Sequence, residues 1–480
     1  MPNTTPGHRA AALALLAALG APAAIPSAPV IHARQEAPES ARHPSLADDV
    51  AGHIPALSKL LDASNFQGLL DLIDQSILPA AKPGSFDQAL FLQIRGQALL
   101  NLGRPLEAIA PLEESLGIAA GKNWFDASVL AQVRQTLSQL HYQKYSELPA
   151  SAGATRRRAV LDDAQRHAKQ WLALAGPRPN PDIFYYAATL DYAAGTLDPE
   201  KPGRPALEAS LAAAGESLAR RPALHEASLL LAAAIHQQLG DSRAVAEHLE
   251  VLLARDPRNP VYWRQLFAIY IGLATEARTP SQVRLWQARA LLTQRRAREL
   301  LPASATPAQD GRLDTPQDYL NTTALLFSLG QHDEAALTLE DALATGRLPP
   351  TRQHWELLAS AWQRHREPSR AMAALERAVA QTPDDPELRL HLARLLLHGE
   401  NPKAAFAQTS AAVALTQNRE KPAKFASPAE AWFLHAYAAY EHHDFSAATA
   451  ALDTAAAQPG ASRLDASIRQ LRQAVAAVAK

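Results

Sequence analysis

Residues 354–386 place bulky and small apolar side chains at regular intervals along the chain. Counted from Trp355, these positions lie 3, 4, 7, 16, 20, 23 and 28 residues further on, at Leu358, Ala359, Trp362, Ala371, Leu375, Ala378 and Pro383. The first intervals put the bulky side chains in one stripe on a helix. Small side chains at Ala359, Ala371 and Ala378 let a second helix approach closely, and Pro383 ends that helix. The pattern therefore predicts a helix–turn–helix unit.

The same unit recurs along the chain. The next copy follows in frame, because Leu392, Ala393, Leu396, Ala405 and Ala412 each lie 34 residues after their counterparts. Further copies contain Tyr319, Gly330 and Leu339; Trp432, Ala436 and Leu452; Ala233, Gly240 and Leu249, leading directly to Trp263; and Gly96, Gly103 and Leu112. These intervals and this period resemble the tetratricopeptide repeat. The resemblance implies an all-α fold, a right-handed α-solenoid of tetratricopeptide helix–turn–helix repeats with a C-terminal capping helix.

The repeats are not uniform along the chain. Between residues 120 and 222 the frame is lost, although helices are expected near 126–145, 156–174, 182–193 and 204–219, and residues 271–316 carry an insertion. The expected organisation is a signal peptide at 1–24, a flexible linker at 25–45, degenerate N-terminal repeats at 46–225, a repeat unit plus an extended unit with an insertion at 226–311, a regular array at 312–460 and a capping helix at 461–480.

Composition and charge narrow the function classes. The 480 residues are too many for one ordinary globular core, which suits several domains or a repeat array. Apolar residues make up 47 % of the chain, chiefly alanine and leucine, which favour helices. The 47 basic and 48 acidic residues nearly cancel, so no overall field attracts a phosphate backbone and nucleic acid is not expected as a partner. The absence of cysteine excludes disulfides and thiolate chemistry.

The N-terminus predicts export. Arg9 precedes the apolar run 10–19, and small residues around Ala23 and Ala24 offer a cleavage site. A run of this length is typical of a secretory signal peptide and is too short for a lasting membrane anchor. No later apolar stretch reaches the roughly 18 residues that a membrane span needs. We therefore expect a periplasmic protein, cleaved near Ala23 or Ala24, with no integral membrane span in the mature chain.

The sequence contains no motif that predicts catalysis. Phosphate-binding loops, nucleophile elbows and zinc-protease motifs are all missing. Three histidines, His435, His442 and His443, lie near one expected helix–turn junction, but a helix separates the first two by about 10.5 Å, too far to share an ion. The acidic pair Asp384 and Asp385 sits where acidic residues begin a helix, so capping is the better interpretation. We expect neither an enzyme nor a bound cofactor or metal.

A solenoid of helix pairs exposes the first helix of each pair on its concave face, which suits an extended segment or a partner helix. Candidate partner-binding residues are the positions on that face that avoid the stripe between helices. They are Arg264, Gln353, Glu356, Gln363, Arg364, Arg394, His398, Phe433, Tyr437 and Tyr440. Arginine and aromatic residues are enriched at binding hot spots, so this set predicts a protein or peptide ligand.

Residues 225–465 also resemble a narrower group, the periplasmic tetratricopeptide proteins that accompany TonB–ExbB–ExbD systems. The order of motifs carries this resemblance, through Trp263, Asn321, Gly346, Leu348, Leu358, Ala359, Trp362, Arg366 and Glu367. The insertion at 271–316 and the end of the chain depart from the group's pattern. The resemblance implies a non-catalytic accessory component of an energy-transducing transport system, with a TonB-system component as the partner.

Two other functions stay open at this point. A scaffold of an envelope-assembly or polysaccharide-export complex would share the fold and differ only in its partner. An enzyme is the remote alternative, because no nucleophile, metal or phosphate motif supports one.

Overall fold

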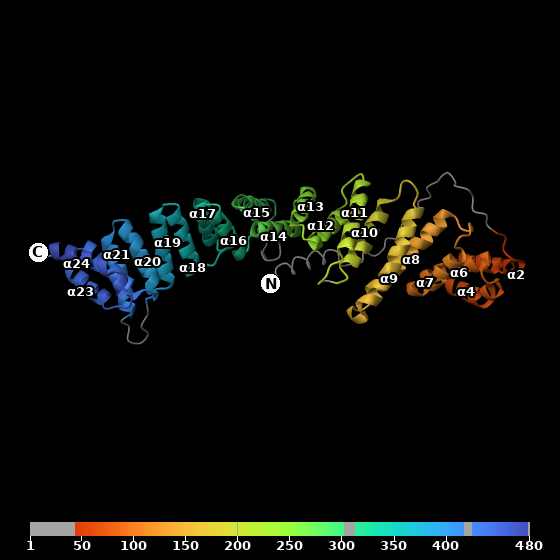
Figure 1. The fold of residues 1–480 in the computed structure, drawn as a ribbon, viewed down its shortest axis with the longest axis horizontal. Helices are drawn as coiled ribbons and strands as arrows, with labels where there is room; N and C mark the ends of the chain where they lie inside the picture. The colour runs from red at the N-terminus through yellow and green to blue at the C-terminus, as the bar shows by residue number, and fades with distance from the viewer. Residues whose placement is uncertain (1–43, 199, 302–312, 417–424, 479–480) are drawn as a thin grey trace. The chain divides into compact units, whose positions relative to one another are not determined.

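The computed structural model describes residues 44–198, 200–301, 313–416 and 425–478, and Figure 1 traces them from the N-terminal to the C-terminal end of the chain. These ranges fold into helices and contain no β-strand. The all-α prediction is confirmed. Consecutive helices pack as pairs, and successive pairs stack on one another as an α-solenoid. The expected signal peptide and most of the expected linker lie outside the described residues.

The chain divides into two compact units at residues 255 and 256, a division that the repeat pattern does not indicate. Helices of the first unit, in red to green in Figure 1, are α2 (Asp48–Ala51), α3 (Ile54–Asp62), α4 (Phe66–Leu72), α5 (Leu78–Ala80), α6 (Phe86–Asn101), α7 (Ile109–Ile118), α8 (Ala127–Glu147), α9 (Ala154–Leu174), α10 (Pro181–Gly195), α11 (Arg204–Ala219), α12 (Glu226–Leu239) and α13 (Ser242–Arg255). From α6 onward they pack as consecutive pairs, α6 with α7 and so on to α12 with α13.

The second unit, in green to blue, continues with paired helices and ends on a single one. Its helices are α14 (Pro260–Glu276), α15 (Pro280–Leu300), α16 (Pro316–Ser328), α17 (His332–Ala344), α18 (Arg352–Arg364), α19 (Pro368–Gln381), α20 (Pro386–His398), α21 (Pro402–Thr416), α22 (Pro428–Glu441), α23 (Phe445–Ala456) and α24 (Asp465–Val478). The last of them packs on α23 and covers apolar side chains there, as expected of a capping helix.

Proline accounts for where many of these helices begin. It occupies the first position of α10, α14, α15, α16, α19, α20, α21 and α22. At that position its missing N–H leaves no hydrogen bond unmade and its fixed φ already suits a helix. The preceding residue often caps the helix as well: the Asp385 carboxylate accepts a hydrogen bond from the backbone N–H of Leu388 at 3.1 Å. The capping interpretation of this acidic pair is confirmed for Asp385.

Small side chains set the spacing within each pair. Ala359, Ala371 and Ala378 are fully buried between α18 and α19, which confirms the expected packing. In the first unit Gly96 has the same role, because a Cβ atom there would lie 2.5 Å from Cγ of Leu112. Close approach of the two helices therefore depends on the absence of bulk at these positions.

The turn inside a pair uses a left-handed residue. Gly103 (φ 70°) and Gly330 (φ 76°) occupy it where glycine is present. The same place, the second residue after the first helix, is taken by Arg366 (φ 65°), Glu400 (φ 55°) and His443 (φ 63°) in three consecutive pairs. These pairs therefore keep the left-handed backbone conformation of the turn even though glycine is absent there.

Helix length explains why the repeat frame is lost between residues 120 and 222. Helices are found at α8, α9, α10 and α11, as predicted, but α8 and α9 have 21 residues each. The helices of the regular pair α18 and α19 have 13 and 14. Longer helices stretch the period without changing the pairing. Among the described helices, none has the length and apolar character that crossing a membrane requires.

Replacing Ala371 with phenylalanine tests the packing of α18 on α19. The side chain of Ala371 is fully buried, so Ala371→Phe overpacks the contact and should cost about 1–3 kcal/mol of stability. Ala373→Phe is the matched control, because Ala373 is exposed on the same helix. Thermal unfolding followed by circular dichroism should show a lower midpoint for the first variant only. Equal midpoints would contradict the assigned register.

Candidate functional site

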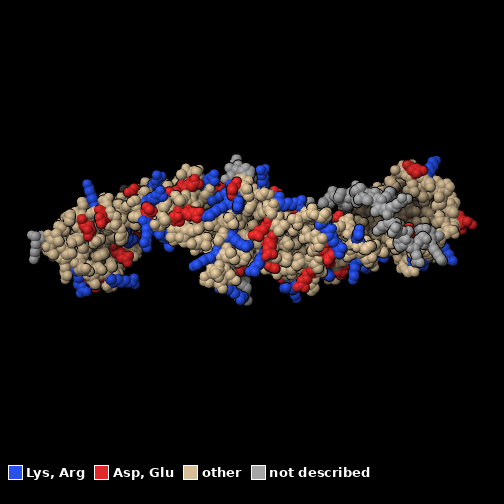
Figure 2. Space-filling view, turned by 90° about the horizontal axis from the view of Figure 1, so that it is seen from above, with Lys and Arg blue, Asp and Glu red and all other residues tan. Residues whose placement is uncertain are grey.

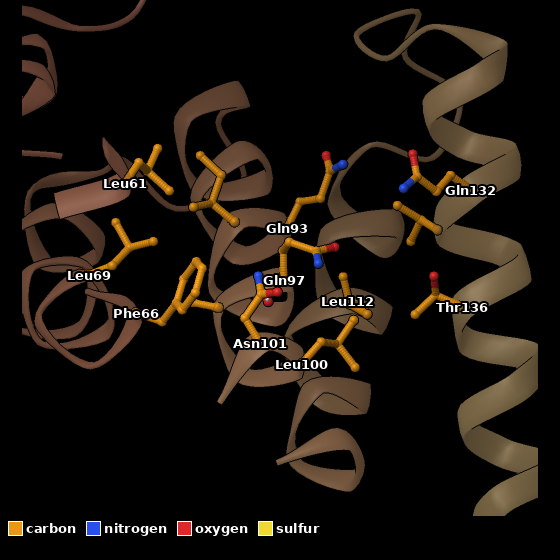
Figure 3. A pocket seen from close by; sticks show the side chains of 13 residues that line it. Leu61, Phe66, Leu69, Gln93, Gln97, Leu100, Asn101, Leu112, Gln132 and Thr136 are labelled. Atoms are coloured by element: carbon orange, nitrogen blue, oxygen red, sulfur yellow. Dashed lines mark hydrogen bonds between the residues drawn. The ribbon is translucent and has the colours of Figure 1, made fainter. Parts of the chain in front are cut away.

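A groove in the first unit is lined by side-chain amides, and Figure 3 shows it from close by. Gln93, Gln97 and Asn101 lie four residues apart on α6, so they share one face of that helix. Gln132 and Thr136, also four apart, lie across from them on α8. The groove between these two rows of polar side chains is called the amide groove below. Its cavity volume is about 260 Å³.

Apolar side chains form the rest of the lining. Leu61 comes from α3, Phe66 and Leu69 come from α4, and Leu112 and Val133 come from α7 and α8. Leu61 is 42 % exposed, which leaves an apolar surface at the edge of the groove. The groove thus combines polar groups on two facing helices with an apolar wall.

The amide groove is neutral, and several of its side-chain amides are available for hydrogen bonds to a ligand. None of its 13 lining residues is charged. Asn101 donates from Nδ2 to the carbonyl oxygen of Gln97 at 3.0 Å, whereas the side chains of Gln93, Gln97 and Gln132 make no hydrogen bond to any other described residue. Each glutamine amide can donate two hydrogen bonds and accept others. A ligand that offers both donors and acceptors, and no charge, matches this chemistry.

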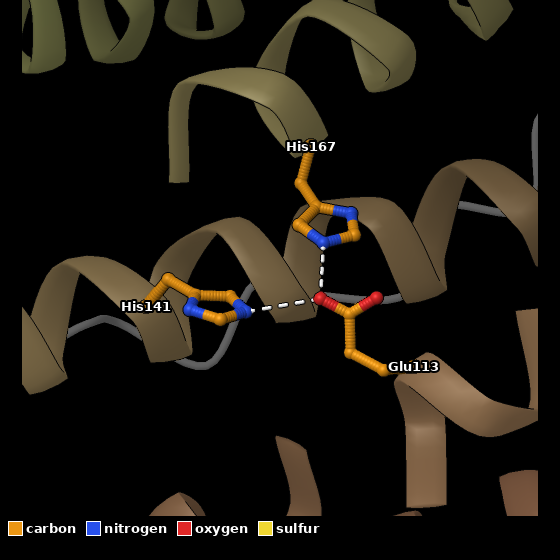
Figure 4. A group of neighbouring side chains, drawn as sticks. All are labelled: Glu113, His141 and His167. Atoms are coloured by element: carbon orange, nitrogen blue, oxygen red, sulfur yellow. Dashed lines mark hydrogen bonds and ion pairs between the residues drawn. The ribbon is translucent and has the colours of Figure 1, made fainter. Parts of the chain in front are cut away.

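A second polar site lies nearby in the same unit. Glu113 of α7, His141 of α8 and His167 of α9 place their ligand-type atoms within 4.8 Å of one another. Figure 4 shows both imidazole rings directed at the Glu113 carboxylate. Oε1 of Glu113 lies 3.1 Å from Nε2 of His141 and 2.7 Å from Nε2 of His167. Both histidines are buried, His167 completely.

Two arginines contact this cluster. Nη2 of Arg166 lies 3.3 Å from the same Glu113 oxygen, and Nη1 of Arg134 lies 3.1 Å from Nδ1 of His167. Hydrogen bonds from His141 and then from His167 hold the pKa of the Glu113 carboxyl well below its usual range, and the charge of Arg166 adds to this effect against the cost of burial. Glu113 is therefore ionised at neutral pH.

The contact with Arg134 fixes the tautomer of His167. A guanidinium group only donates and a carboxylate only accepts, so a neutral His167 accepts from Arg134 at Nδ1 and carries its proton on Nε2, which lies 2.7 Å from Glu113. The longer approach of Arg166 to the same Nε2, at 3.4 Å, is then not a hydrogen bond. Nε2–H of His167 then donates to Glu113.

The partner-binding residues predicted in the second unit lie on four of its helices. Arg264 lies on α14; Gln353, Glu356, Gln363 and Arg364 on α18; Arg394 and His398 on α20; and Phe433, Tyr437 and Tyr440 on α22. Gln353, Arg364, Arg394, His398 and Tyr437 are exposed, and the other five are half-buried. These helices are the first members of their pairs, as the prediction assumed.

Several of these residues already have partners within the chain. Glu356 accepts a hydrogen bond from Arg352 at 3.2 Å, and Arg352 also pairs with Asp385. Nε2 of Gln363 lies 3.2 Å from Nε2 of His391. Arg364 lies over the ring of Phe327, and Phe433 packs against the cluster under α22. Each of these contacts is with a residue outside the predicted set, so the set does not form one preassembled site.

The surface carries both signs of charge. Figure 2 shows lysine and arginine interspersed with aspartate and glutamate on the face in view, which agrees with a net charge of −1. Ion pairs such as Arg95 with Asp74, at 2.7 Å, account for part of this mixture.

Neither site of the first unit was predicted from the sequence. The amide groove had a usable signal, since glutamine and asparagine recur every four residues in α6. The Glu113 cluster had none, because its members are separated by 28 and 54 residues along the chain and belong to three helices.

Paired helices, small residues at their contact and a left-handed turn between them define the chain as a helix-pair repeat protein. Comparison with known families makes this specific: the tetratricopeptide repeat family matches residues 364–425, which include α19, α20 and α21. The fold is a tetratricopeptide-type α-solenoid. No curated protein sequence matches the chain.

Solved structures similar to this chain include several repeat proteins. The Cut9–Hcn1 hetero-tetramer of APC/C matches with 17 % identity over 88 % of this chain and 76 % of that one, with a TM-score of 0.26. A tetratricopeptide repeat protein from Parabacteroides merdae matches with 11 % identity over 73 % of this chain and 100 % of that one, with a TM-score of 0.30. YrrB, described as a tetratricopeptide protein with an unusual peptide-binding site, matches with 17 % identity over 44 % and 92 %, also with a TM-score of 0.30.

The tautomer of His167 is open to direct measurement. In protein treated with a chelator, long-range ¹H–¹⁵N correlation spectra should show neutral His167 with its proton on Nε2, because Arg134 donates to Nδ1. Arg134→Met removes that donor and should raise the population of the other tautomer. A wild-type spectrum with the proton on Nδ1 would contradict the hydrogen bonding described here.

Proposed function

We propose that this protein is a non-catalytic scaffold that binds an extended segment of a partner protein in the amide groove. The amide ladder on α6, opposed by Gln132 and Thr136 on α8, is the observation that carries the proposal. Helix-pair solenoids use the surface formed by their first helices for such binding. α6 and α8 are the first helices of two consecutive pairs.

The chemistry of the groove suits a peptide backbone. Each residue of an extended peptide presents one N–H donor and one C=O acceptor and carries no backbone charge. Glutamine amides can meet both groups, whereas an ionised side chain would meet only one kind. Leu61, Phe66 and Leu69 offer an apolar wall for a side chain of the same peptide. Recognition would therefore depend mainly on backbone shape and on one or two apolar residues.

Removing amides from both sides of the groove tests this function. The ligands to be assayed are overlapping synthetic peptides that cover the exported parts of ExbD and TonB encoded in the same genome. Each hydrogen bond contributes about 1 kcal/mol, so Gln97→Ala combined with Gln132→Ala should weaken binding by about 2 kcal/mol, roughly thirtyfold. Fluorescence anisotropy with labelled peptides measures the change.

Gln170→Ala is the matched control for the peptide assay. Gln170 is exposed on α9, outside the groove lining, so its removal should leave peptide affinity unchanged. Full binding by the double variant, or loss of binding in the control as well, would place the peptide elsewhere. Failure of every peptide to bind the intact protein would count against this choice of partner.

The biological setting that we propose is the periplasm, with the protein as an accessory component of a TonB–ExbB–ExbD system. The motif order over residues 225–465 and the signal-peptide pattern around Arg9 support this setting. A scaffold of an envelope-assembly or polysaccharide-export complex is the alternative, and it would be favoured if no TonB-system component were captured. Fractionation of cells tests the compartment, since a periplasmic protein should appear there cleaved near Ala23 or Ala24.

Two exposed residues of the second unit provide a separate test of the TonB assignment. Arg394 on α20 and Tyr437 on α22 are accessible, and truncating an arginine or aromatic hot spot typically costs on the order of 2 kcal/mol. Arg394→Ala combined with Tyr437→Ala should strongly reduce co-purification with the TonB complex, leaving only the contact through the amide groove, while the circular dichroism spectrum stays helical. Arg469→Ala, on exposed surface of α24, is the control and should co-purify normally. Full co-purification of the double variant would move the contact off this face.

A further inference from the structure

The Glu113, His141 and His167 cluster lies outside the lining of the amide groove. A repeat core is ordinarily filled by apolar side chains. Instead, two buried imidazoles and a carboxylate from three different helices converge here. The surroundings of each histidine indicate what kind of ligand this cluster can bind.

His141 has a carboxylate on both sides. Its Nε2 lies 3.1 Å from Glu113, and its Nδ1 lies 3.9 Å from Oδ2 of Asp163. Nδ1 is buried and makes no hydrogen bond to any part of the chain that the structure describes. A neutral imidazole carries one proton, so one of its nitrogens must direct a lone pair at a carboxylate. A second proton would remove this conflict, and so would a metal cation at Nε2, because the single proton can then sit on Nδ1 and face Asp163.

His167 and the arginines can adapt to such a cation. His167 keeps one proton, which moves from Nε2 to Nδ1 when Nε2 becomes a ligand. Arg134 must then turn away, since its guanidinium would face an N–H group. Arg166 is 52 % exposed and already pairs with Asp163 at 2.9 Å, so it can leave Glu113 without losing a partner.

We propose that Glu113, His141 and His167 form a binding site for a divalent transition-metal ion, with Zn²⁺ as the preferred occupant. Two imidazole nitrogens and one carboxylate oxygen are a ligand set typical of zinc. The three ligand atoms lie within 4.8 Å of one another, and Glu113 Oε1 lies 3.1 Å and 2.7 Å from the two Nε2 atoms. Small side-chain shifts would bring these atoms to the separations of about 3.3 Å that zinc bonds of about 2.0–2.1 Å need. Asp163 would orient His141, as carboxylates commonly do for zinc-bound histidines.

The position of the site suggests what the ion would do. Glu113 belongs to the pair α6 and α7, whereas His141 and His167 belong to the pair α8 and α9. A bound ion would therefore link two consecutive helix pairs through coordinate bonds. The amide groove is formed by the first helices of the same two pairs, so the ion would hold both sides of that groove.

Metal titration of the full chain tests the proposal. Protein treated with a chelator and dialysed should bind one Zn²⁺ per chain at this site in isothermal titration calorimetry. His141→Ala and Glu113→Gln should each weaken that binding by more than about a hundredfold, beyond the loss caused by residues that only orient a ligand. His435→Ala is the control, because His435 is also buried but lies in the second unit, so this variant should keep the site. Circular dichroism establishes that each variant is folded.

Arg134→Met separates a metal site from adventitious binding. It removes the donor that opposes the zinc-bound tautomer of His167, so it should strengthen Zn²⁺ binding, whereas it would not affect ions held elsewhere on the surface. In the wild-type protein, Zn²⁺ should also shift the His167 proton from Nε2 to Nδ1 in ¹H–¹⁵N spectra, a readout that does not depend on any variant. Binding that survives His141→Ala, or no Zn²⁺-dependent change at His167, would overturn the proposal.

Discussion

Close approach of the two helices within each pair is the constraint on which the rest of this structure depends. In the second unit it is met by alanine, as at Ala371. In the first unit buried serines meet it as well: the Oγ atoms of Ser115, Ser138 and Ser210 each donate at 2.7 Å to an alanine carbonyl oxygen on the partner helix, in three consecutive pairs. A carbonyl oxygen has a second lone pair, so these bonds join two helices without disturbing either. Both polar sites of the first unit rest on helices held in this way.

The repeat could be derived from sequence because it depends on local spacing, whereas the sites depend on how helices are rotated against one another. The intervals from Trp355 to Pro383 identify which faces are buried, and the second unit follows them. The 21-residue helices α8 and α9 broke the period, which hid the register that brings His141 and His167 together. Only the glutamines of α6 left a pattern that a sequence could reveal, and their partners on α8 depend on packing.

The two units present different chemistry to a partner. The amide groove of the first unit is neutral, and the side-chain amides of its glutamines make no hydrogen bond to another described residue. In the second unit the charged side chains of α18 are already engaged, as Arg352 pairs with both Glu356 and Asp385. Charges that are paired within the chain contribute little to an interface unless a partner replaces them. This arrangement favours recognition of peptide backbone by the first unit. In the second unit it favours contacts through exposed arginine and tyrosine side chains.

The left-handed turns at Arg366, Glu400 and His443 have a consequence for the evolution and engineering of the chain. A residue with a Cβ atom in this conformation costs about 1 kcal/mol relative to glycine, and three consecutive pairs carry that cost. Replacing these three residues with glycine should therefore raise the free energy of unfolding. The three positions are remote from the amide groove in sequence. Natural proteins commonly lie only slightly above the stability that they need. Glycine at these turns offers a route to a more robust scaffold that leaves the helix faces, and whatever they bind, unchanged.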